Sequence, residues 1–354
     1  MTTLPSLTPA YLDAIRLNPT DASAFAVLGT FRGRQELFRR QTPEVLEGLR
    51  NVALVESSES SNRIEGVVAP HDRVEAMVLR NSTPANRSEQ EIAGYRDALA
   101  LIHESGREMT FSVNLVLQLH SLLYRYQSGR GGQWKATENE IVERDASGRV
   151  TRVRFVPPGP VAVPQLMADL TDNHRAARDA GRDPLILIPL VVLDFLSIHP
   201  FSDGNGRTGR LLSLMLLYQG DFEVGRFISL ERIIEESKET YYEALERSSV
   251  GWHEDRHDPL PWMRYFWGVL IAAYKEFEER VGTIRVGRGS KEDVVEQAIA
   301  RQVTPFSISD ILADSPGVSR DWVKLLLRRL RDEGRIELIG RGRGAKWVRV
   351  ENRG

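Results

Sequence analysis

Twelve mostly polar residues, His199–Arg210 (HPFSDGNGRTGR), separate two strongly apolar segments in the middle of this 354-residue chain. The segment before them, LILIPLVVLDFLSI, contains a proline and Asp194 and is too short for a membrane span, so it predicts a buried helix. The segment after them, LLSLMLLY, predicts a second buried helix. A polar stretch between two buried helices calls for a functional explanation.

The glycines and arginines of this stretch predict an anion site. Gly204 and Gly206 flank Asn205 just before a helix begins, which leaves backbone N–H groups free to converge on an anion. Arg207 and Arg210 share one face of the first helical turn, where the helix dipole disfavours positive charge. Two arginines placed against that field indicate a strong anion between them. A polyphosphate fits, because arginine offers a rigid bidentate fork.

Two further side chains complete the predicted chemistry. Asp203 precedes the glycines, and a carboxylate beside phosphates is typical of a site for Mg²⁺. His199 stands four residues earlier, where a neutral imidazole could take a proton from an attacking hydroxyl. Each residue alone also has a plain structural explanation: a core histidine, a turn-forming aspartate or solvated arginines. Their combination within twelve residues favours the functional one.

The stretch also contains a misleading match. GNGRTG, Gly204–Gly209, fits the G-x-G-x-x-G pattern of dinucleotide-binding folds. That pattern should directly follow a strand and open a βαβ unit. Here HPFSD intervenes and the neighbouring segments are helical, so we expect no such fold.

The same residues carry a more specific resemblance. HPFSDGNGRTGR resembles the signature of the Fic (Fido) family, H-x-F-x-[DE]-G-N-G-R-x-x-R, and every fixed position is met. The resemblance implies a mainly α fold with a helical core and a β-hairpin flap. It implies transfer of AMP from ATP to a Ser, Thr or Tyr hydroxyl of a protein, including the chain itself. It further implies that His199 is the general base, that Asp203 holds Mg²⁺ and that Phe201 anchors the loop. The ATP-binding residues that it implies are Gly204, Asn205, Gly206, Arg207, Arg210, Tyr241 and Tyr242.

The two tyrosines belong to YYEAL, Tyr241–Leu245, which is similar to the segment that lines the adenine pocket in the family. They could equally be core tyrosines. Where some relatives have an asparagine near the adenine, this chain has Ser249. The identity of the transferred group therefore stays open, and UMP or phosphate are alternatives.

A second motif lies upstream, in SSESSNRIEG. Ser61-x-x-x-Glu65-Gly66 resembles the family's inhibitory motif, [ST]-x-x-x-E-[GN]. The resemblance implies that Glu65 pairs with Arg210 and diverts it from the γ-phosphate. The charges agree with this, because Glu65 stands at a helix C-terminus and Arg210 at a helix N-terminus. The plain alternative is a solvated glutamate before a helix-ending glycine.

The rest of the chain gives an outline of domains. We expect an N-terminal helical region with the inhibitory helix over 1–100, the catalytic core over 101–284 and a third domain over 285–354. Helices are predicted from Pro43 to about Gly66, over 88–105, over 111–126 and from Val163 to beyond Glu278. Alternation around Val153 and Phe155 predicts a hairpin, and 281–290 is expected to be a linker.

The C-terminal domain differs in charge. From 285 to 354 the chain has 15 Lys and Arg against 10 Asp and Glu, net +5, so the remainder carries −7. Helices over 290–302, 307–314 and 319–335, followed by a two-stranded hairpin, are typical of a winged helix. DNA contact is expected through four basic residues, Arg328, Arg329, Arg343 and Lys346, and a dimerisation module is the alternative.

Composition narrows the setting. The chain has no cysteine, and its N-terminus lacks the pattern of a signal peptide, so we expect a cytoplasmic protein without membrane contact. The resulting hypothesis is a self-inhibited protein adenylyltransferase, with a homodimer possible. Two alternatives remain: a hydrolase that removes AMP through the same pocket, and a winged-helix transcription regulator with a nucleotide-sensing core.

Overall fold

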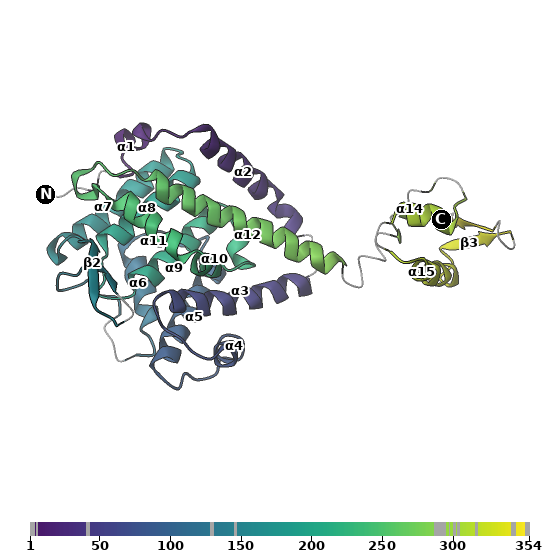
Figure 1. Cartoon of the computed structure of the whole chain (residues 1–354), viewed down its shortest axis with the longest axis horizontal. Helices are drawn as coiled ribbons and strands as arrows, with labels where there is room; N and C mark the ends of the chain where they lie inside the picture. Colours follow the sequence, from purple (N-terminus) through teal and green to yellow (C-terminus); the bar gives the residue numbers. More distant parts are fainter. Residues whose placement is uncertain are drawn as a thin grey trace. The chain divides into compact units, whose positions relative to one another are not determined.

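The chain forms two compact units, Met1–Phe277 and Glu278–Gly354 (Figure 1). This computed structural model describes residues 4, 6–39, 43–127, 131–144, 147–286, 295–296, 298–299, 302, 305–315, 318–340 and 345–350. The first unit is almost entirely helical, with one small antiparallel sheet. The prediction of a mainly α protein with a β-hairpin is therefore confirmed. The expected division at residues 100 and 284 stays a prediction.

In the part that the structure describes, the N-terminal half of the first unit is built from six helices. They are α1 (Pro9–Ala14), α2 (Pro19–Arg39), α3 (Pro43–Ile64), α4 (His71–Arg80), α5 (Arg87–Ser105) and α6 (Val113–Leu123). Helix α3 packs on α4 and α5, and α5 packs on α6. Short polar caps start two of them, because Asn86 and Ser112 accept hydrogen bonds from the first turns of α5 and α6. The helices predicted over 43–66, 88–105 and 111–126 are confirmed, with ends that differ by a few residues.

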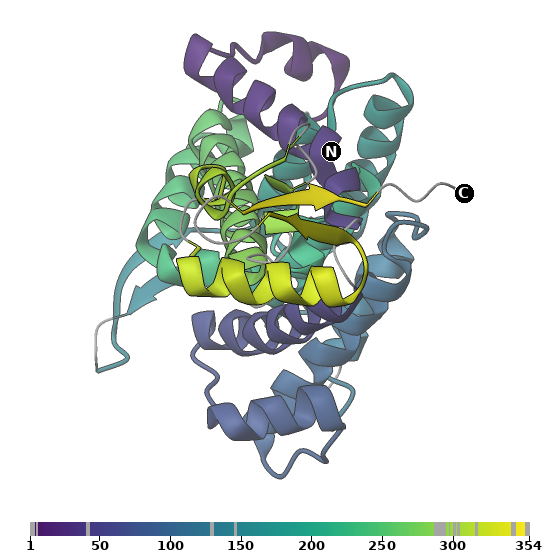
Figure 2. The same ribbon diagram turned by 90° about the vertical axis from the view of Figure 1, so that its right-hand side faces the viewer.

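The C-terminal half of the first unit holds the hairpin and the buried helices. Its elements are β1 (Ile141–Arg144), β2 (Val150–Phe155), η1 (Pro160–Ala162), α7 (Val163–Asp179), α8 (Pro184–Ile198), α9 (Asn205–Gln219), η2 (Val224–Arg226), α10 (Leu230–Glu236), α11 (Lys238–Ser249), η3 (Trp252–Glu254) and α12 (Leu260–Val286). The two strands pair antiparallel, with Ile141 opposite Phe155, and the hairpin projects from the helices (Figures 1 and 2). The predicted hairpin is confirmed.

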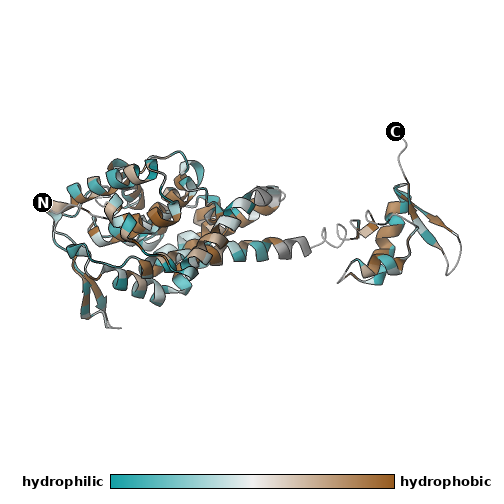
Figure 3. Cartoon of the chain, turned by 90° about the horizontal axis from the view of Figure 1, so that it is seen from above, coloured by the Kyte–Doolittle hydropathy of each residue, from teal (hydrophilic) through white to brown (hydrophobic). Residues whose placement is uncertain are grey.

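Helices α8 and α9 form the centre of the unit and pack on each other. Helix α8 begins at the N-cap Asp183 with Pro184 in its first turn, and almost all of its side chains are buried. Apolar segments accordingly gather in the interior, whereas the outer helices and the hairpin are more hydrophilic (Figure 3). The polar stretch between α8 and α9 is thus held by two buried helices.

Helix α12 corrects the expected linker. The helix runs to Val286, so the first six residues of the stretch 281–290 are helical rather than extended. The glycine at 282 is not enough to end a helix whose preceding turns are anchored by buried aromatic residues such as Trp267 and Phe277. Residues 287–290 lie outside the described residues.

The second unit contains α14 (Ile308–Ala313), α15 (Arg320–Asp332), β3 (Ile336–Ile339) and β4 (Lys346–Arg349). A capping box between Ser307 and Asp310 starts α14, and the strands pair antiparallel. Most of the helix expected over 290–302, and Arg343, lie outside the described residues. The winged helix and its DNA contact stay predictions, and Arg328 and Arg329 lie on the exposed side of α15.

The packing of α5 on α6 generates a stability prediction. A Cβ at Gly94 of α5 would collide with the backbone carbonyl of Leu123, whereas a Cβ at Gly48 of α3 would meet nothing within 4 Å. We expect Gly94→Ala to lower the free energy of unfolding by about 1–3 kcal/mol. Gly48→Ala should raise it by roughly 0.5–1 kcal/mol, because alanine is the better helix former. Urea denaturation of both variants measures this, and equal stabilities would contradict the packing.

Candidate active site

His199 ends helix α8 in a left-handed conformation, with φ of 49°. Its Nδ1 lies 3.2 Å from the carbonyl oxygen of Leu196, so Nδ1 carries the proton and Nε2 keeps its lone pair. Burial lowers the pKa of His199 to about 4, so the ring is neutral at pH 7. Among the described residues nothing hydrogen-bonds Nε2, and His199 lines a large groove. This is the state that a general base requires.

The loop after His199 is held by its own side chains. The amide of Asn205 accepts a hydrogen bond from the Phe201 N–H at 2.9 Å and donates to the Phe201 carbonyl at 2.8 Å. Phe201 is fully buried and stacks on His120, with ring centroids 3.6 Å apart. The side chain of Asn205 is therefore occupied within the loop. A contribution of Asn205 to phosphate binding would come from its backbone or from keeping the loop in shape.

The N-terminus of α9 is open. Its N-cap is Gly204, with φ of 80°, and no side chain caps the first turn. The first N–H groups of the helix therefore have no side-chain cap, as expected for the glycine-rich stretch. A Cβ at Gly206 would collide with the carboxylate of Glu65, which shows that this carboxylate covers the first turn of α9.

Asp203 lies beside this turn with a largely exposed side chain. Burial alone would raise its pKa, but the charge of Arg207 and hydrogen bonds from Tyr124 and the Gly204 N–H outweigh it and hold the pKa below its usual range. The group is thus a carboxylate at neutral pH. The described residues contain no cluster of three or more side chains that could hold a metal alone. A single exposed carboxylate nevertheless fits Mg²⁺ that arrives with phosphates, since this ion needs only one or two protein ligands.

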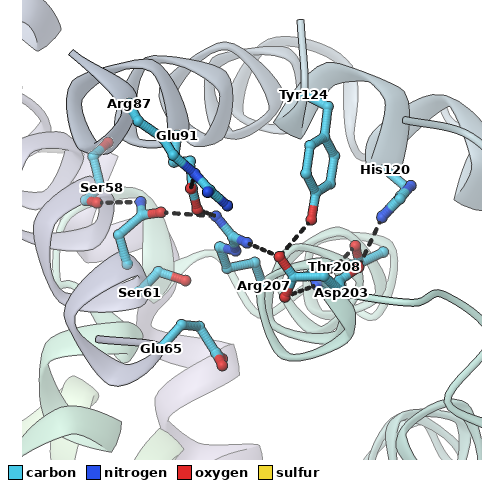
Figure 4. Close-up of polar contacts among 12 residues, drawn as sticks. Ser58, Ser61, Glu65, Arg87, Glu91, His120, Tyr124, Asp203, Arg207 and Thr208 are labelled. Atoms are coloured by element: carbon cyan, nitrogen blue, oxygen red, sulfur yellow. Dashed lines mark hydrogen bonds and ion pairs between the residues drawn. The ribbon is translucent and has the colours of Figure 1, made fainter. Parts of the chain in front are cut away.

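Arg207 is buried, which rules out the solvated arginine considered from the sequence. Its Nη1 donates to Glu91 at 2.7 Å and to Asn62 at 3.3 Å, and its Nη2 lies 3.4 Å from Asp203 (Figure 4). Only Nε lacks a partner among the described residues. Arg207 therefore connects α3, α5 and the loop.

Arg210 is also buried, and it contacts Ser61 and Glu65 of the upstream motif. Its Nε donates to the Ser61 hydroxyl at 2.8 Å, and its Nη2 donates to the Ser61 carbonyl and to Glu65, each at 2.8 Å. Burial opposes its charge, but the carboxylate of Glu65 raises the pKa of Arg210 above its usual value. Gly66, with φ of 83°, ends α3 directly after Glu65. The expected pairing of Glu65 with Arg210 is thus present in the structure.

A groove with a volume of about 1230 Å³ passes His199, Glu65 and the first turn of α9. It is lined by the end of α3, the hairpin, α8 and α11, and it includes His199, Glu65 and Gly206. Tyr241 and Tyr242 both line it, although Tyr241 is also packed against Trp262 in the core. The ring of Tyr242 lies beneath Arg154, with the guanidinium carbon 5.4 Å from the ring centroid. The structure therefore brings together candidate residues from three regions of the sequence: the Ser61–Gly66 motif, the His199–Arg210 stretch and the tyrosine pair at 241–242.

Several site residues were not anticipated from the sequence. Asn62 and Glu91 hold Arg207, while His120 and Tyr124 hold the loop at Asp203. The spacing of His120 and Tyr124, one turn apart on an amphipathic helix, was the available signal. Nothing in the sequence indicated which buried helix they would meet.

The comparisons with known proteins agree with the loop at the start of α9. Residues 110–217 match the Fic/DOC family. The chain is similar to the protein adenylyltransferase fic-1 of Caenorhabditis briggsae, with 26% identity over 40% of this chain and 26% of the relative. It is similar to the protein adenylyltransferase Fic of Nematostella vectensis, with 25% identity over 58% of this chain and 44% of the relative. The chain thus spans less than half the length of either relative.

The fold has a solved counterpart. A Fic family protein from Desulfovibrio desulfuricans G20 superposes with a TM-score of 0.60 and 22% identity, covering 96% of this chain and 98% of that one. Together with the signature and its geometry, these matches support a Fic domain over residues 110–217 of this chain. No described helix has the length and hydrophobicity that crossing a membrane requires.

The burial of His199 generates a prediction about its titration. Because desolvation lowers its pKa to about 4, the ring should stay neutral from pH 8 to about pH 5.5. His71 is the internal control, since its hydrogen bond with Glu59 raises its pKa and it should protonate at a higher pH than His199. NMR titration of the imidazole protons measures both. A midpoint of His199 near pH 6.5 would contradict the structure.

Proposed function

We propose that this chain is a protein adenylyltransferase that Glu65 holds in a self-inhibited state. The observation that carries the proposal is the ion pair between Glu65 and Arg210 directly beside the loop that presents His199 and Asp203. Two relatives named protein adenylyltransferase support the reaction class. The substrates are ATP and a hydroxyl group of a protein, which includes this chain.

The geometry suits attack of a hydroxyl on the α-phosphate. The neutral Nε2 of His199 takes the proton, the hydroxyl oxygen bonds to the α-phosphorus, and the bond to the bridging oxygen of the β-phosphate breaks. The open first turn of α9 binds the phosphates and stabilises the charge of the departing pyrophosphate. Mg²⁺ bound at Asp203 would neutralise further phosphate charge.

Self-inhibition follows from the position of Glu65. Its carboxylate lies over Gly206 and occupies one arm of the Arg210 fork, whereas Nη1 of Arg210 has no partner among the described residues. A triphosphate that enters the groove meets a negative charge where its outer phosphate should bind. It therefore adopts a pose that is unsuited to in-line attack.

A hydrolase remains the second candidate, on one observation. The side chain of Glu65 is 30% exposed and lines the groove together with His199, so it could orient a water molecule toward an AMP-modified hydroxyl. Incubation with an AMP-modified protein, followed by mass spectrometry, separates removal from addition. A homodimer stays an expectation.

Glu65→Gly should activate the enzyme. Removal of the carboxylate frees Arg210 for the outer phosphate, and a charge-assisted contact of about 1.5–3 kcal/mol corresponds to roughly a tenfold to hundredfold gain. Incorporation of labelled AMP into the chain itself should therefore rise at least about tenfold. Glu59→Gly is the control, because Glu59 lies on the same helix but pairs with Arg63 and His71.

Two further substitutions, each combined with Glu65→Gly, identify the side chains on which AMP transfer depends. Arg210→Ala should cancel the gain, since the freed guanidinium is the proposed agent. His199→Ala should lower transfer by about 10²–10⁴-fold while leaving ATP binding largely intact, because a base acts on the hydroxyl. Equal incorporation by wild type and Glu65→Gly would remove the inhibitory role of Glu65.

A further inference from the structure

His120 of α6 and Tyr124, the residue that follows the last turn of α6, contact the same loop residue from one side. The Tyr124 hydroxyl donates to Oδ2 of Asp203 at 2.9 Å, and Nε2 of His120 lies 3.0 Å from the Asp203 backbone carbonyl (Figure 4). They lie one helical turn apart, so a single helix face reaches both the backbone and the side chain of Asp203. The same two side chains also close over Gly204, where a Cβ would lie 3.2 Å from the Tyr124 hydroxyl and 3.3 Å from His120 Nε2.

The tautomer of His120 is set by a second contact. The Gly132 N–H donates to Nδ1 at 2.9 Å, so Nδ1 is the acceptor and Nε2 carries the proton that Asp203 accepts. His120 is buried and stacks on Phe201 with the two rings nearly parallel. The imidazole is therefore a fixed, neutral donor beneath the loop.

Two hydrogen bonds set where the carboxylate of Asp203 points, because the Gly204 N–H donates to Oδ1 at 2.7 Å and the Tyr124 hydroxyl holds Oδ2. The side chain is 66% exposed, so packing does not fix its rotamer. Its Oδ2 has two possible partners, the Tyr124 hydroxyl at 2.9 Å and Nη2 of Arg207 at 3.4 Å. Without the hydroxyl, the carboxylate would close on Arg207, since a charged donor makes the stronger hydrogen bond. Tyr124 thus holds Asp203 at the mouth of the α9 anion site.

We propose that His120 and Tyr124 are positioning residues that present Asp203 to the Mg²⁺ of Mg²⁺–ATP. The proposal rests on the adenylyltransferase function proposed above. Neither residue touches the reacting atoms in this proposal, because both act through Asp203. Their loss should therefore weaken the contribution of Mg²⁺ to nucleotide binding and leave metal-free nucleotide binding unchanged.

The main test is Tyr124→Phe in the Glu65→Gly background. Calorimetry with a non-hydrolysable ATP analogue should give parental affinity without Mg²⁺ and about tenfold weaker affinity with Mg²⁺, the effect of losing one hydrogen bond to a charged group. The Mg²⁺ concentration for half-maximal AMP transfer should rise by a similar factor. Tyr126→Phe is the matched control, because Tyr126 donates to Asp97 at 2.8 Å, away from the loop.

His120 is tested by two substitutions in the same background. His120→Gln retains an N–H donor toward the Asp203 carbonyl and should keep most of the Mg²⁺-dependent affinity, whereas His120→Ala should lose it. Thermal denaturation of each variant separates this effect from a loss of folding, because Gln and Ala both remove the stacking on Phe201.

The outcomes distinguish the two proposals. A Glu65→Gly parent that binds no ATP analogue with Mg²⁺ would overturn the proposed function and the positioning role with it. A parent that binds, beside a Tyr124→Phe variant with the same Mg²⁺ dependence, would overturn the positioning role alone. Equal weakening of affinity with and without Mg²⁺ would also contradict it, since the residues would then act on the phosphate site.

Discussion

The guanidinium of Arg210 must find its acceptors inside the protein, because the side chain is almost completely removed from solvent. Ser61 of α3 supplies its hydroxyl and carbonyl, and Glu65, directly after the helix, supplies its carboxylate. This requirement ties the end of α3 to the first turn of α9. It also leaves one nitrogen, Nη1, without a partner among the described residues, next to the open helix terminus.

The same helix is anchored along its length, so α3 is part of the core rather than a detachable strap. Asn62 accepts from Arg207, and Ser57 donates to the buried carboxylate of Glu231 at 2.7 Å. The Tyr95 hydroxyl of α5 donates a second hydrogen bond to the same carboxylate of Glu231, at 2.8 Å. Glu65, at 30% exposure, is the loosest of these groups. On this account inhibition is relieved by movement of the Glu65 side chain, while α3 stays in place.

The sequence predicted the elements and the polar centre because both depend on local patterns. Apolar periodicity located α8 and α9, and the glycines predicted the open helix terminus between them. Local patterns in the sequence could not predict which side chains reach this centre from helices that are distant in the chain. His120 and Glu91 contact the loop or Arg207 only after α5 and α6 pack beside it, so no local pattern reveals which residues they meet. The sequence also left open that Arg207 is exposed to solvent. This interpretation is wrong, because Arg207 is buried and donates to Glu91, which is 116 positions away in the sequence.

The central claim is that Glu65 withholds Arg210 from the outer phosphate of ATP. Calorimetry with a non-hydrolysable ATP analogue and with ADP, on wild type and Glu65→Gln, measures this directly. The neutral amide removes the charge at nearly constant volume. The account predicts that affinity for the triphosphate rises about tenfold more than affinity for the diphosphate, because only the former has the phosphate that Arg210 would bind. Equal gains for both nucleotides would contradict it.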